Sequence, residues 1–371
     1  ALLEKGDASL GFEWKVFRAT QFMEMAKTGL RSLYGKHRQT HRNALMALVV
    51  AECIEAKGRY MDDIVDGVWA VCEESWWGKP WHLETQIGGA DLANIEDGSV
   101  DLFVAETASL LSWTCYLLGP QLDNFSTMIL PRIDYEIRQH ILGPCLDGRD
   151  QHWMGFGRTS ESRVNNWNPW ITSNWITTIL LMEKDPERRV AALHKSMHVL
   201  DQFIDPYPKD GGCDEGPGYW GRAGASMFEC LESLHSATHG GINVYDDPLI
   251  QNIGQFITRV HIHDHYFVNF ADAAALVKPS PFLVYRYGKR IGDADMMGMA
   301  AYFAKNQSKV GSDSIARLIP ALLLGSELSA VKPYQPLPLE TWLPDIQVMT
   351  ARDRAGSKQG FYVAAKGGHN D

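Results

Sequence analysis

The chain turns from loop to helix in the stretch Asp210-Gly-Gly-Cys-Asp-Glu-Gly-Pro-Gly-Tyr-Trp-Gly-Arg-Ala-Gly224. Its glycines and its proline are incompatible with a regular helix. The same stretch holds three carboxylates, a tyrosine and an arginine, and apolar residues at helical spacing follow it. Because glycine lets the backbone approach a ligand closely, we interpret this loop as a candidate binding site. The alternative is an ordinary structural turn between two helices.

A second segment is rich in tryptophan and asparagine. Between Trp153 and Trp175 the chain places four tryptophans and four asparagines within 23 positions, including Asn165-Asn-Trp-Asn168. An indole offers a flat apolar face to the C–H face of a sugar, and an amide offers donors and an acceptor to hydroxyls and carboxylates. The segment therefore favours a carbohydrate ligand. Core tryptophans beside helix-capping asparagines are the alternative.

These two segments, in this order, resemble the heparinase II/III-like polysaccharide lyases and their alginate and oligo-uronide lyase relatives. The resemblance spans roughly residues 12 to 371, and the Asp-Glu-Gly-Pro-Gly-Tyr-Trp run is its most specific part. Three further stretches support it: Cys72-Glu-Glu-Ser-Trp-Trp77 with Pro80-Trp-His82, Asp101-Leu-Phe-Val-Ala-Glu-Thr107, and Gly360 to Asp371. The resemblance implies a polysaccharide lyase.

The fold that the resemblance implies is all-α, an (α/α) toroid of helical hairpins, followed by the first strands of an antiparallel β-sandwich. We expect the toroid at residues 1–331, a proline-rich linker at 332–340 and the start of the sandwich at 341–371. In the family the sandwich continues with a catalytic histidine and metal ligands. The chain is therefore expected to be the N-terminal part of a longer lyase, with its own C-terminal sandwich domain as a partner.

Helical periodicity dominates residues 1–331 and supports this expectation. The pattern predicts a helix from Leu102 that stops at Gly119-Pro120, and another over 122–142 that kinks at Pro131. Asp185-Pro186 and Asp247-Pro248 are typical helix starts. A helix is also predicted over 223–237, and two strands over 346–352 and 360–366.

Composition limits the partners. The net charge of −10 and pI near 5.7 argue against nucleic acid as the main partner. No run of about 18 apolar residues indicates a membrane span. The expected partner is an acidic polysaccharide or oligosaccharide. The N-terminus shows no signal-peptide pattern, so a periplasmic or secreted location presumes that a signal peptide has been removed.

The cysteine and histidine patterns favour no metal. Six scattered cysteines without CxxC spacing predict free buried thiols. His261, His263 and His265 share a face only on a strand, so a sugar-contacting cleft wall or a solvated helix end is favoured over metal binding. No cofactor is expected in this chain, since the resemblance places a structural metal in the C-terminal domain.

Uronate glycans can be cleaved by β-elimination, which removes the weakly acidic proton beside the carboxylate and expels the oxygen at C4. The carboxylate must be neutralised as charge develops, and a base and an acid must move protons. A tyrosine can serve as either, provided that its pKa of about 10 falls for the base role. Arg222 lies three residues from Tyr219, so its charge could favour the phenolate.

The resemblance places the carboxylate neutraliser at Asn166 and the catalytic tyrosine at Tyr219. Several alginate-type members have histidine after that asparagine; Trp167 stands here, which is closer to the heparinase III type. Substrate contacts are predicted for a set of aromatic, amide and acidic side chains: Trp76, Trp77, His82, Asn165, Trp167, Asn168, Glu215, Trp220 and His265.

Two other functions stay open from the sequence. Asp210, Asp214 and Glu215 could provide the paired carboxylates of a glycoside hydrolase, since toroids also host hydrolases. Against this, acids in a loop are explained by solvation and helix capping. The third alternative is a module that binds a glycan without cleaving it.

Overall fold

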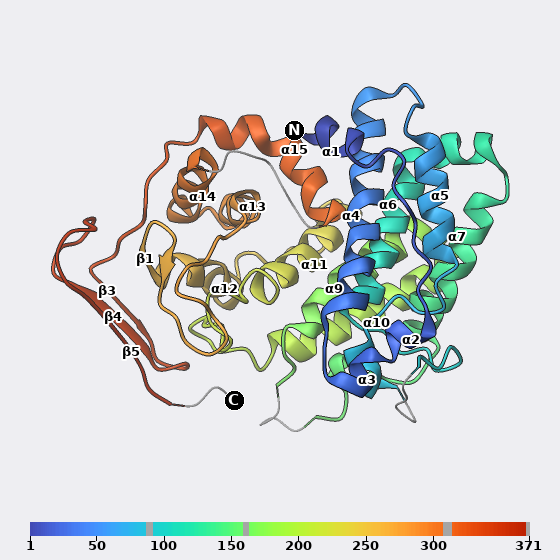
Figure 1. Ribbon diagram of the computed structural model, residues 1–371. Coiled ribbons are helices and arrows are strands. Elements are labelled where there is room, and N and C mark those ends of the chain that lie inside the picture. Colours follow the sequence, from blue (N-terminus) through green and yellow to red (C-terminus); the bar gives the residue numbers. More distant parts are fainter. Residues whose placement is uncertain (87–91, 159–162, 307–313, 369–371) are drawn as a thin grey trace. The chain divides into compact units, whose positions relative to one another are not determined.

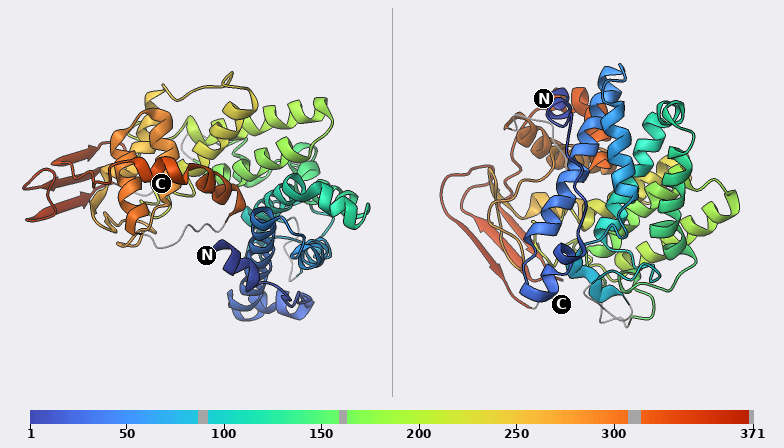
Figure 2. Two further views of the ribbon diagram at one scale, coloured as in Figure 1. Left: turned by 90° about the horizontal axis from the view of Figure 1, so that it is seen from above. Right: turned by 45° about the vertical axis from the view of Figure 1, so that its right-hand side comes forward.

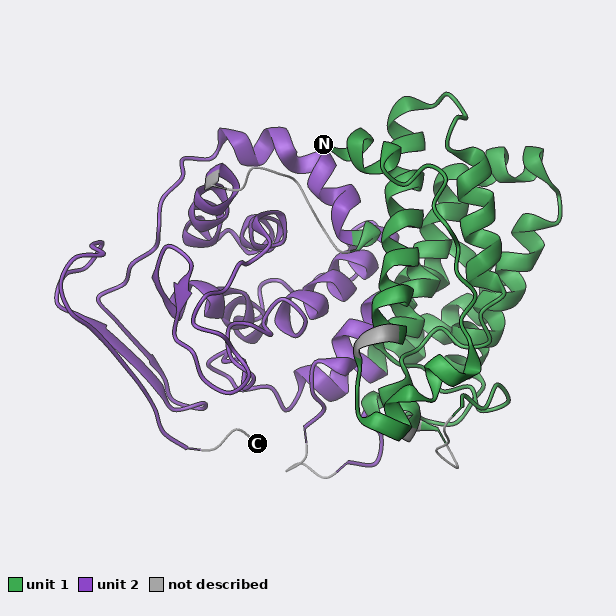
Figure 3. Ribbon diagram, viewed as in Figure 1, with its two compact units in different colours: residues 1–154, 174–198, 313–316 green, residues 155–173, 199–312, 317–371 purple. Residues whose placement is uncertain are grey.

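The computed structural model describes residues 1–86, 92–158, 163–306 and 314–368, and Figure 1 shows the succession of helices along them. The chain forms two compact units, drawn in different colours in Figure 3. Unit 1 comprises residues 1–154, 174–198 and 313–316. Unit 2 comprises residues 155–173, 199–312 and 317–371. Each unit is described by itself below.

The described residues of unit 1 form helices joined by loops, without a strand. Its long helices are α4 (Ser32–Glu55), α5 (Met61–Cys72) and α6 (Leu102–Phe125), and α4 runs beside both α1 (Leu2–Asp7) and α6. The shorter elements are α2 (Ala19–Phe22), α3 (Glu24–Thr28), η1 (Pro80–Thr85), α7 (Ile129–Ile137), η2 (Arg138–Leu142), α8 (Gly143–Leu146) and η3 (His152–Met154). The core between the long helices is apolar, with Leu45, Leu48, Ile64 and Leu111 fully buried.

Helix α6 corrects the prediction of a stop at Gly119-Pro120. The helix continues through Pro120 to Phe125. A proline inside a helix loses one backbone hydrogen bond, but Leu118 and Leu122 on either side of it are buried, and that burial keeps the segment helical. The helix is long and apolar enough to cross a membrane, yet 67% of its most apolar stretch is buried in the protein, as is typical of a core helix.

The predicted helix over 122–142 is confirmed only from Ile129 onward, and the expected role of Pro131 is corrected. Residues 122–125 belong to α6, and α7 starts only at Ile129. Pro131 therefore lies in the first turn of α7, where backbone N–H groups have no helical partner and a proline causes no kink. The backbone instead changes to a π-helix at η2, Arg138–Leu142.

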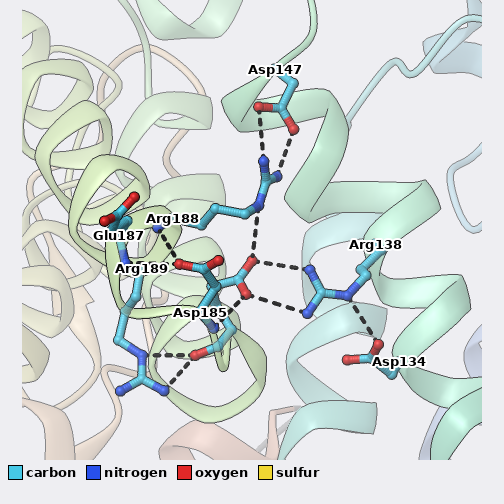
Figure 4. Close-up of polar contacts among 8 residues, drawn as sticks. Asp134, Arg138, Asp147, Asp185, Glu187, Arg188 and Arg189 are labelled. Atoms are coloured by element: carbon cyan, nitrogen blue, oxygen red, sulfur yellow. Dashed lines mark hydrogen bonds and ion pairs between the residues drawn. The ribbon is translucent and has the colours of Figure 1, made fainter.

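The junction between α9 (Trp167–Met182) and α10 (Pro186–Ile204) holds a charged network in unit 1, drawn in Figure 4. Asp185 caps α10 as predicted, because its carboxylate accepts hydrogen bonds from the backbone N–H groups of Glu187 (2.9 Å) and Arg188 (3.1 Å). The buried Glu183 accepts from the guanidinium of Arg138 at 3.1 and 3.3 Å.

Unit 2 combines helices with short strands. Its elements include the predicted α11 (Gly224–Ala237) and α12 (Pro248–Arg259), then β1 (His261–His263), β2 (Tyr266–Phe267), α13 (Pro281–Ile291), α14 (Ala294–Asn306) and α15 (Ile315–Ala330), whose first residues belong to unit 1. Asp247 caps α12 as predicted and accepts from the N–H of Leu249 at 2.7 Å. Helices α13 and α14 pack closely side by side.

The C-terminal residues form one antiparallel sheet, seen from two sides in Figure 2. Its strands are β3 (Glu340–Leu343), β4 (Val348–Arg352) and β5 (Tyr362–Lys366), in the order β3-β4-β5. The two predicted strands are confirmed, whereas β3 was missed because its first residue follows a proline-rich run. The boundaries of the predicted domains stay a prediction.

Hydrogen bonds attach the turn between β3 and β4 to the glycine loop of unit 2. The backbone N–H of Asp345 donates to the Asp210 carboxylate at 2.7 Å, and the N–H of Asp210 donates to the Asp345 carboxylate at 3.0 Å. Arg352 also donates to the backbone oxygen of Ile262 at 3.1 Å. The first acid of the loop therefore has a structural role at this junction.

All six cysteines lie in the described residues and are free. Cys72, Cys145, Cys213 and Cys230 are buried as predicted, whereas Cys53 is exposed. Burial raises the pKa of the Cys72 thiol to about 12, so this side chain packs as an apolar group.

Candidate functional site

Asn166 and Glu215 meet in unit 2. Asn166 is 5% exposed and directly precedes α9, and its backbone oxygen accepts from the N–H of Trp170 at 3.1 Å. Its side-chain amide donates to both oxygens of the Glu215 carboxylate, at 2.7 and 2.8 Å. The asparagine predicted to hold a substrate carboxylate thus holds a carboxylate of the chain itself.

Glu215 is in an environment that disfavours its charge. Burial is the largest influence and raises the pKa of its carboxyl group, and the negative charges of Asp214 and Asp272 act in the same direction. The hydrogen bonds from Asn166 oppose the increase in pKa but do not cancel it. Glu215 is therefore protonated more readily than a free glutamate.

Next to Glu215, Asp214 forms an ion pair with Arg163 at 2.8 Å. Both residues line a cavity of about 190 Å³ together with Pro208, Ile346 and Lys366. Arg163 was not predicted as a site residue, although it begins the asparagine–tryptophan segment. Its pairing with Asp214 also reduces the support for a hydrolase, because the Asp214 carboxylate already has a counter-ion.

Tyr219 is placed by the glycines of its loop. Gly216 has a positive φ of 83°, and a Cβ there would lie 2.6 Å from the backbone oxygen of Phe270, so only glycine fits. The backbone N–H of Tyr219 donates to the Gly216 oxygen at 3.2 Å. The ring is half-buried, and its hydroxyl has no hydrogen bond to any described residue.

Arg222 lies over an aromatic ring. Its guanidinium carbon is 4.0 Å from the centre of the Trp170 indole, which is a close cation–π contact. Trp170 was not among the predicted site residues, although it belongs to the tryptophan-rich segment. The electrostatic action of Arg222 on Tyr219 stays a prediction.

Two predicted substrate contacts in this unit are corrected. Trp220 is 1% exposed, and its indole N–H donates to the backbone oxygen of Ile253 at 2.8 Å. Asn168 is fully buried, and its amide donates to the backbone oxygen of Val199 at 2.7 Å. Both side chains support the core beneath the loop and present no surface to a glycan.

The other predicted contacts of unit 2 are accessible. Asn165 is exposed and Trp167 is half-buried at the start of α9, so both keep a surface for a ligand. His265 is also half-buried, with its ring stacked on Phe303 at 5.1 Å. His261 is buried and contacts backbone oxygens. Across the described residues, no three His, Cys, Asp or Glu side chains gather as metal ligands.

Of the predicted contacts of unit 1, Trp77 is a core residue, which corrects the expectation for it, whereas Trp76 lines a cavity of about 560 Å³. Trp77 is fully buried, donates to the Val71 oxygen at 2.9 Å and stacks on His140. Trp76 is 5% exposed. His82 keeps 12% of its side chain exposed, with its ring nitrogen 2.6 Å from the Asp101 carboxylate. The sequence alone did not show which of these neighbouring aromatic side chains would be buried in the core and which would reach the surface.

Three comparisons with known proteins bear on this arrangement. No family model matches the chain, and no curated protein matches it by sequence. Among solved structures, the chain is similar to the heparan sulfate lyase HepC from Pedobacter heparinus, with a TM-score of 0.51 and 14% sequence identity. The match covers 98% of this chain and 55% of that one, so the chain spans about half the length of its structural neighbour.

This similarity confirms the predicted fold class. The described chain is mostly helical with antiparallel strands toward its C-terminal end, in the manner of the heparinase toroid with small sheets. The predicted resemblance to the heparinase-like lyases is thereby confirmed at the level of the fold.

Proposed function

We propose that this chain carries the toroid-side catalytic groups of a polysaccharide lyase that cleaves uronic-acid-containing glycans by β-elimination. The supporting observation is the Asn166 amide, which holds both oxygens of a carboxylate at 2.7 and 2.8 Å. A uronate carboxylate needs the same contact as negative charge spreads onto it. A fixed amide donor stabilises that developing charge without having to reorient.

Tyr219 supplies the proton transfer in this proposal. The Tyr219 phenolate oxygen takes the C5 proton of the uronate as the electron pair moves toward the carboxylate. The C4–oxygen bond then breaks, a C4–C5 double bond forms, and the leaving oxygen receives a proton from the tyrosine hydroxyl. Protons and electrons balance without an external oxidant or reductant. The half-buried ring, with its hydroxyl unbonded to the described residues, suits this role.

Two arginines that lie close to Asn166 and Tyr219 in the sequence favour an acidic substrate. Arg163 faces a polar cavity beside Asp214, and Arg222 lies on the Trp170 ring. An arginine can bind a carboxylate or a sulfate with two parallel hydrogen bonds. An indole can also support a sugar ring, so an acidic saccharide fits this chemistry better than a neutral one.

The test is the product of cleavage. The native protein that contains this chain is incubated with heparan sulfate, alginate and polygalacturonate, and ultraviolet absorbance is followed. β-Elimination produces an unsaturated uronide that absorbs, whereas hydrolysis produces saturated ends that do not. Saturated ends alone would favour the hydrolase and contradict this proposal. Saturable binding with neither product would favour a binding module.

A further inference from the structure

Three side chains of unit 1 combine positive charge with an aromatic face. Lys79 lies just before η1, Trp81 lies within it, and Arg31 directly precedes α4. The Lys79 ammonium is 5.0 Å from the centre of the Trp81 ring, and the Arg31 guanidinium carbon is 5.7 Å from the same centre. Trp81 and Lys79 are half-buried and Arg31 is exposed, so all three reach the surface of the unit.

The buried carboxylate that accepts from the Lys79 backbone is already used by other donors. Asp101 is completely buried and caps α6 by accepting from the N–H groups of Phe103 and Val104 at 2.8 Å each. It also accepts from the backbone N–H of Lys79 at 3.1 Å and lies 2.6 Å from a ring nitrogen of His82. Its lone pairs are therefore largely occupied, and none of these contacts involves the Lys79 ammonium.

Among the described residues, the two cations of the cluster form no ion pair. Within the described part of the chain, neither the Arg31 guanidinium nor the Lys79 ammonium forms an ion pair or a hydrogen bond with a carboxylate. The Lys79 ammonium instead lies 3.3 Å from the centre of the Phe103 ring. Cations held on rings without a counter-ion, in a chain of net charge −10, form a local positive site.

The surroundings of Lys79 also disfavour the charged form of its amine. Burial is the main cause that lowers the pKa of Lys79 to about 8, and the positive charge of Arg38 adds to it. The carboxylates of Glu106 and Asp101 act in the opposite direction. The charged groups around the amine are thus Arg38 from α4, Glu106 and Asp101 from α6, and Arg31 beyond the indole. A bound anion would remove this penalty by supplying the missing opposite charge.

We infer that Arg31, Lys79 and Trp81 form a binding site for one anionic sugar residue of an acidic glycan. The indole supports the C–H face of the sugar, and the two cations bind its carboxylate or sulfate group. In naming a glycan, this inference rests on the proposed function. The site itself lies wholly within unit 1 and takes no part in the chemistry.

The site is tested by binding to the native protein. Calorimetry measures the affinity for a heparan sulfate tetrasaccharide, for the same tetrasaccharide after chemical desulfation, and for neutral cellotetraose. Lys79→Met keeps the length of the side chain but removes the charge, and Lys79→Arg keeps the charge. Lys57→Met is the matched control, because Lys57 is an exposed lysine just beyond the opposite end of α4.

Lys79→Met should weaken binding of the sulfated tetrasaccharide roughly tenfold or more, as the loss of a charged contact does. Lys57→Met and Lys79→Arg should bind nearly as the wild type. Loss restricted to the sulfated ligand identifies sulfate as the bound group, and loss with both acidic ligands identifies the carboxylate. Equal weakening by Lys79→Met and Lys57→Met, or no weakening by Lys79→Met, overturns the inference.

The pH dependence gives a second readout that does not depend on folding of the Met variant. Wild-type affinity should decrease as the pH rises through about 8, where Lys79 loses its proton, and Lys79→Arg should remove this decrease. An identical decrease in Lys79→Arg would overturn the site. If the protein forms the unsaturated product but Lys79→Met binds as tightly as the wild type, only this binding site is overturned. If binding depends on Lys79 but no unsaturated product forms, only the proposed lyase activity is overturned.

Discussion

Glu183 in unit 1 and Glu215 in unit 2 are both held by several donors, yet their environments act in opposite ways. Glu183 receives hydrogen bonds from Arg138 and from the backbone N–H of Asp185, and Arg188 approaches it at 3.5 Å. Burial would raise the pKa of Glu183, but these donors outweigh it and lower the pKa. Glu215 has amide donors and acidic neighbours, and its pKa is raised.

The difference distinguishes a carboxylate with guanidinium partners from a carboxylate that is held by an amide. Two guanidinium groups favour the charged form of Glu183 and tie α7 and η2 to the start of α10 (Figure 4). Glu215 has no cation among its hydrogen-bond donors in the described residues. Its carboxylate is therefore easily protonated, or displaced from the Asn166 amide by a substrate carboxylate. What distinguishes Glu215 from Glu183 is an environment that disfavours its charge.

The largest expected effect lies at the loop of unit 2. Tyr219→Phe keeps the ring and removes the hydroxyl, so lyase turnover should decrease by about 10²–10⁴-fold because proton transfer is lost. Thermal unfolding should stay unchanged. Turnover is measured on the native protein from the rate of unsaturated uronide formation. Tyr135→Phe is the control, since Tyr135 is an exposed tyrosine of unit 1. Near-normal turnover in Tyr219→Phe would remove this residue from the mechanism.

Asn166→Ala tests the partner of Glu215 directly. Turnover should decrease by about 10²–10³-fold, because one preorganised donor to the developing charge is lost. Substrate binding should decrease less, since the donor contributes most in the transition state. Steady-state kcat and KM, measured beside the exposed Asn124→Ala control, separate the two effects. A rise in KM with an unchanged kcat would assign Asn166 to binding alone.

Glu183→Gln tests the structural side of the comparison. We expect a loss of roughly 2–3 kcal/mol in the free energy of unfolding, because charged hydrogen bonds to a buried carboxylate are replaced by neutral ones. Lyase turnover at low temperature should not change. Chemical denaturation, with the exposed Glu13→Gln as the control, measures the loss. A stable variant with impaired turnover would reverse the assignment of the two glutamates.

The lowered pKa of Glu183 also predicts how the free energy of unfolding depends on pH. Because its pKa in the folded chain lies below its ordinary value of 4.5, its contribution is complete above that value. The contribution is lost as the pH falls through the lower pKa of the folded state. The wild type should therefore lose more stability than Glu183→Gln on acidification below about pH 4.5. Parallel losses in the two proteins would contradict this assignment.

The sequence predicted the helical fold and singled out the two segments that the candidate site joins, because glycine spacing and apolar periodicity are local signals. It did not predict the contact between Asn166 and Glu215, which joins residues 49 positions apart. It also assigned Trp77 and Trp220 to the substrate, although both are core residues. Residue type shows that a tryptophan suits a sugar, but only packing shows whether its face is exposed.

Glu215→Gln gives the smallest and most specific test. A uronate carboxylate that reaches Asn166 must share the amide with Glu215, and two adjacent charges repel unless Glu215 is protonated. Because the pKa of Glu215 is raised, wild-type affinity for a uronate oligosaccharide should decrease from a pH above the usual glutamate range. The decrease should be at most about tenfold per pH unit, the limit for uptake of one proton. Asp214, Asp272 and Arg163 are unchanged in Glu215→Gln. The substitution should therefore remove only the part of the pH dependence of affinity that comes from Glu215. Calorimetry between pH 4.5 and 8 measures it, and the same slope in both proteins would show that Glu215 only positions Asn166.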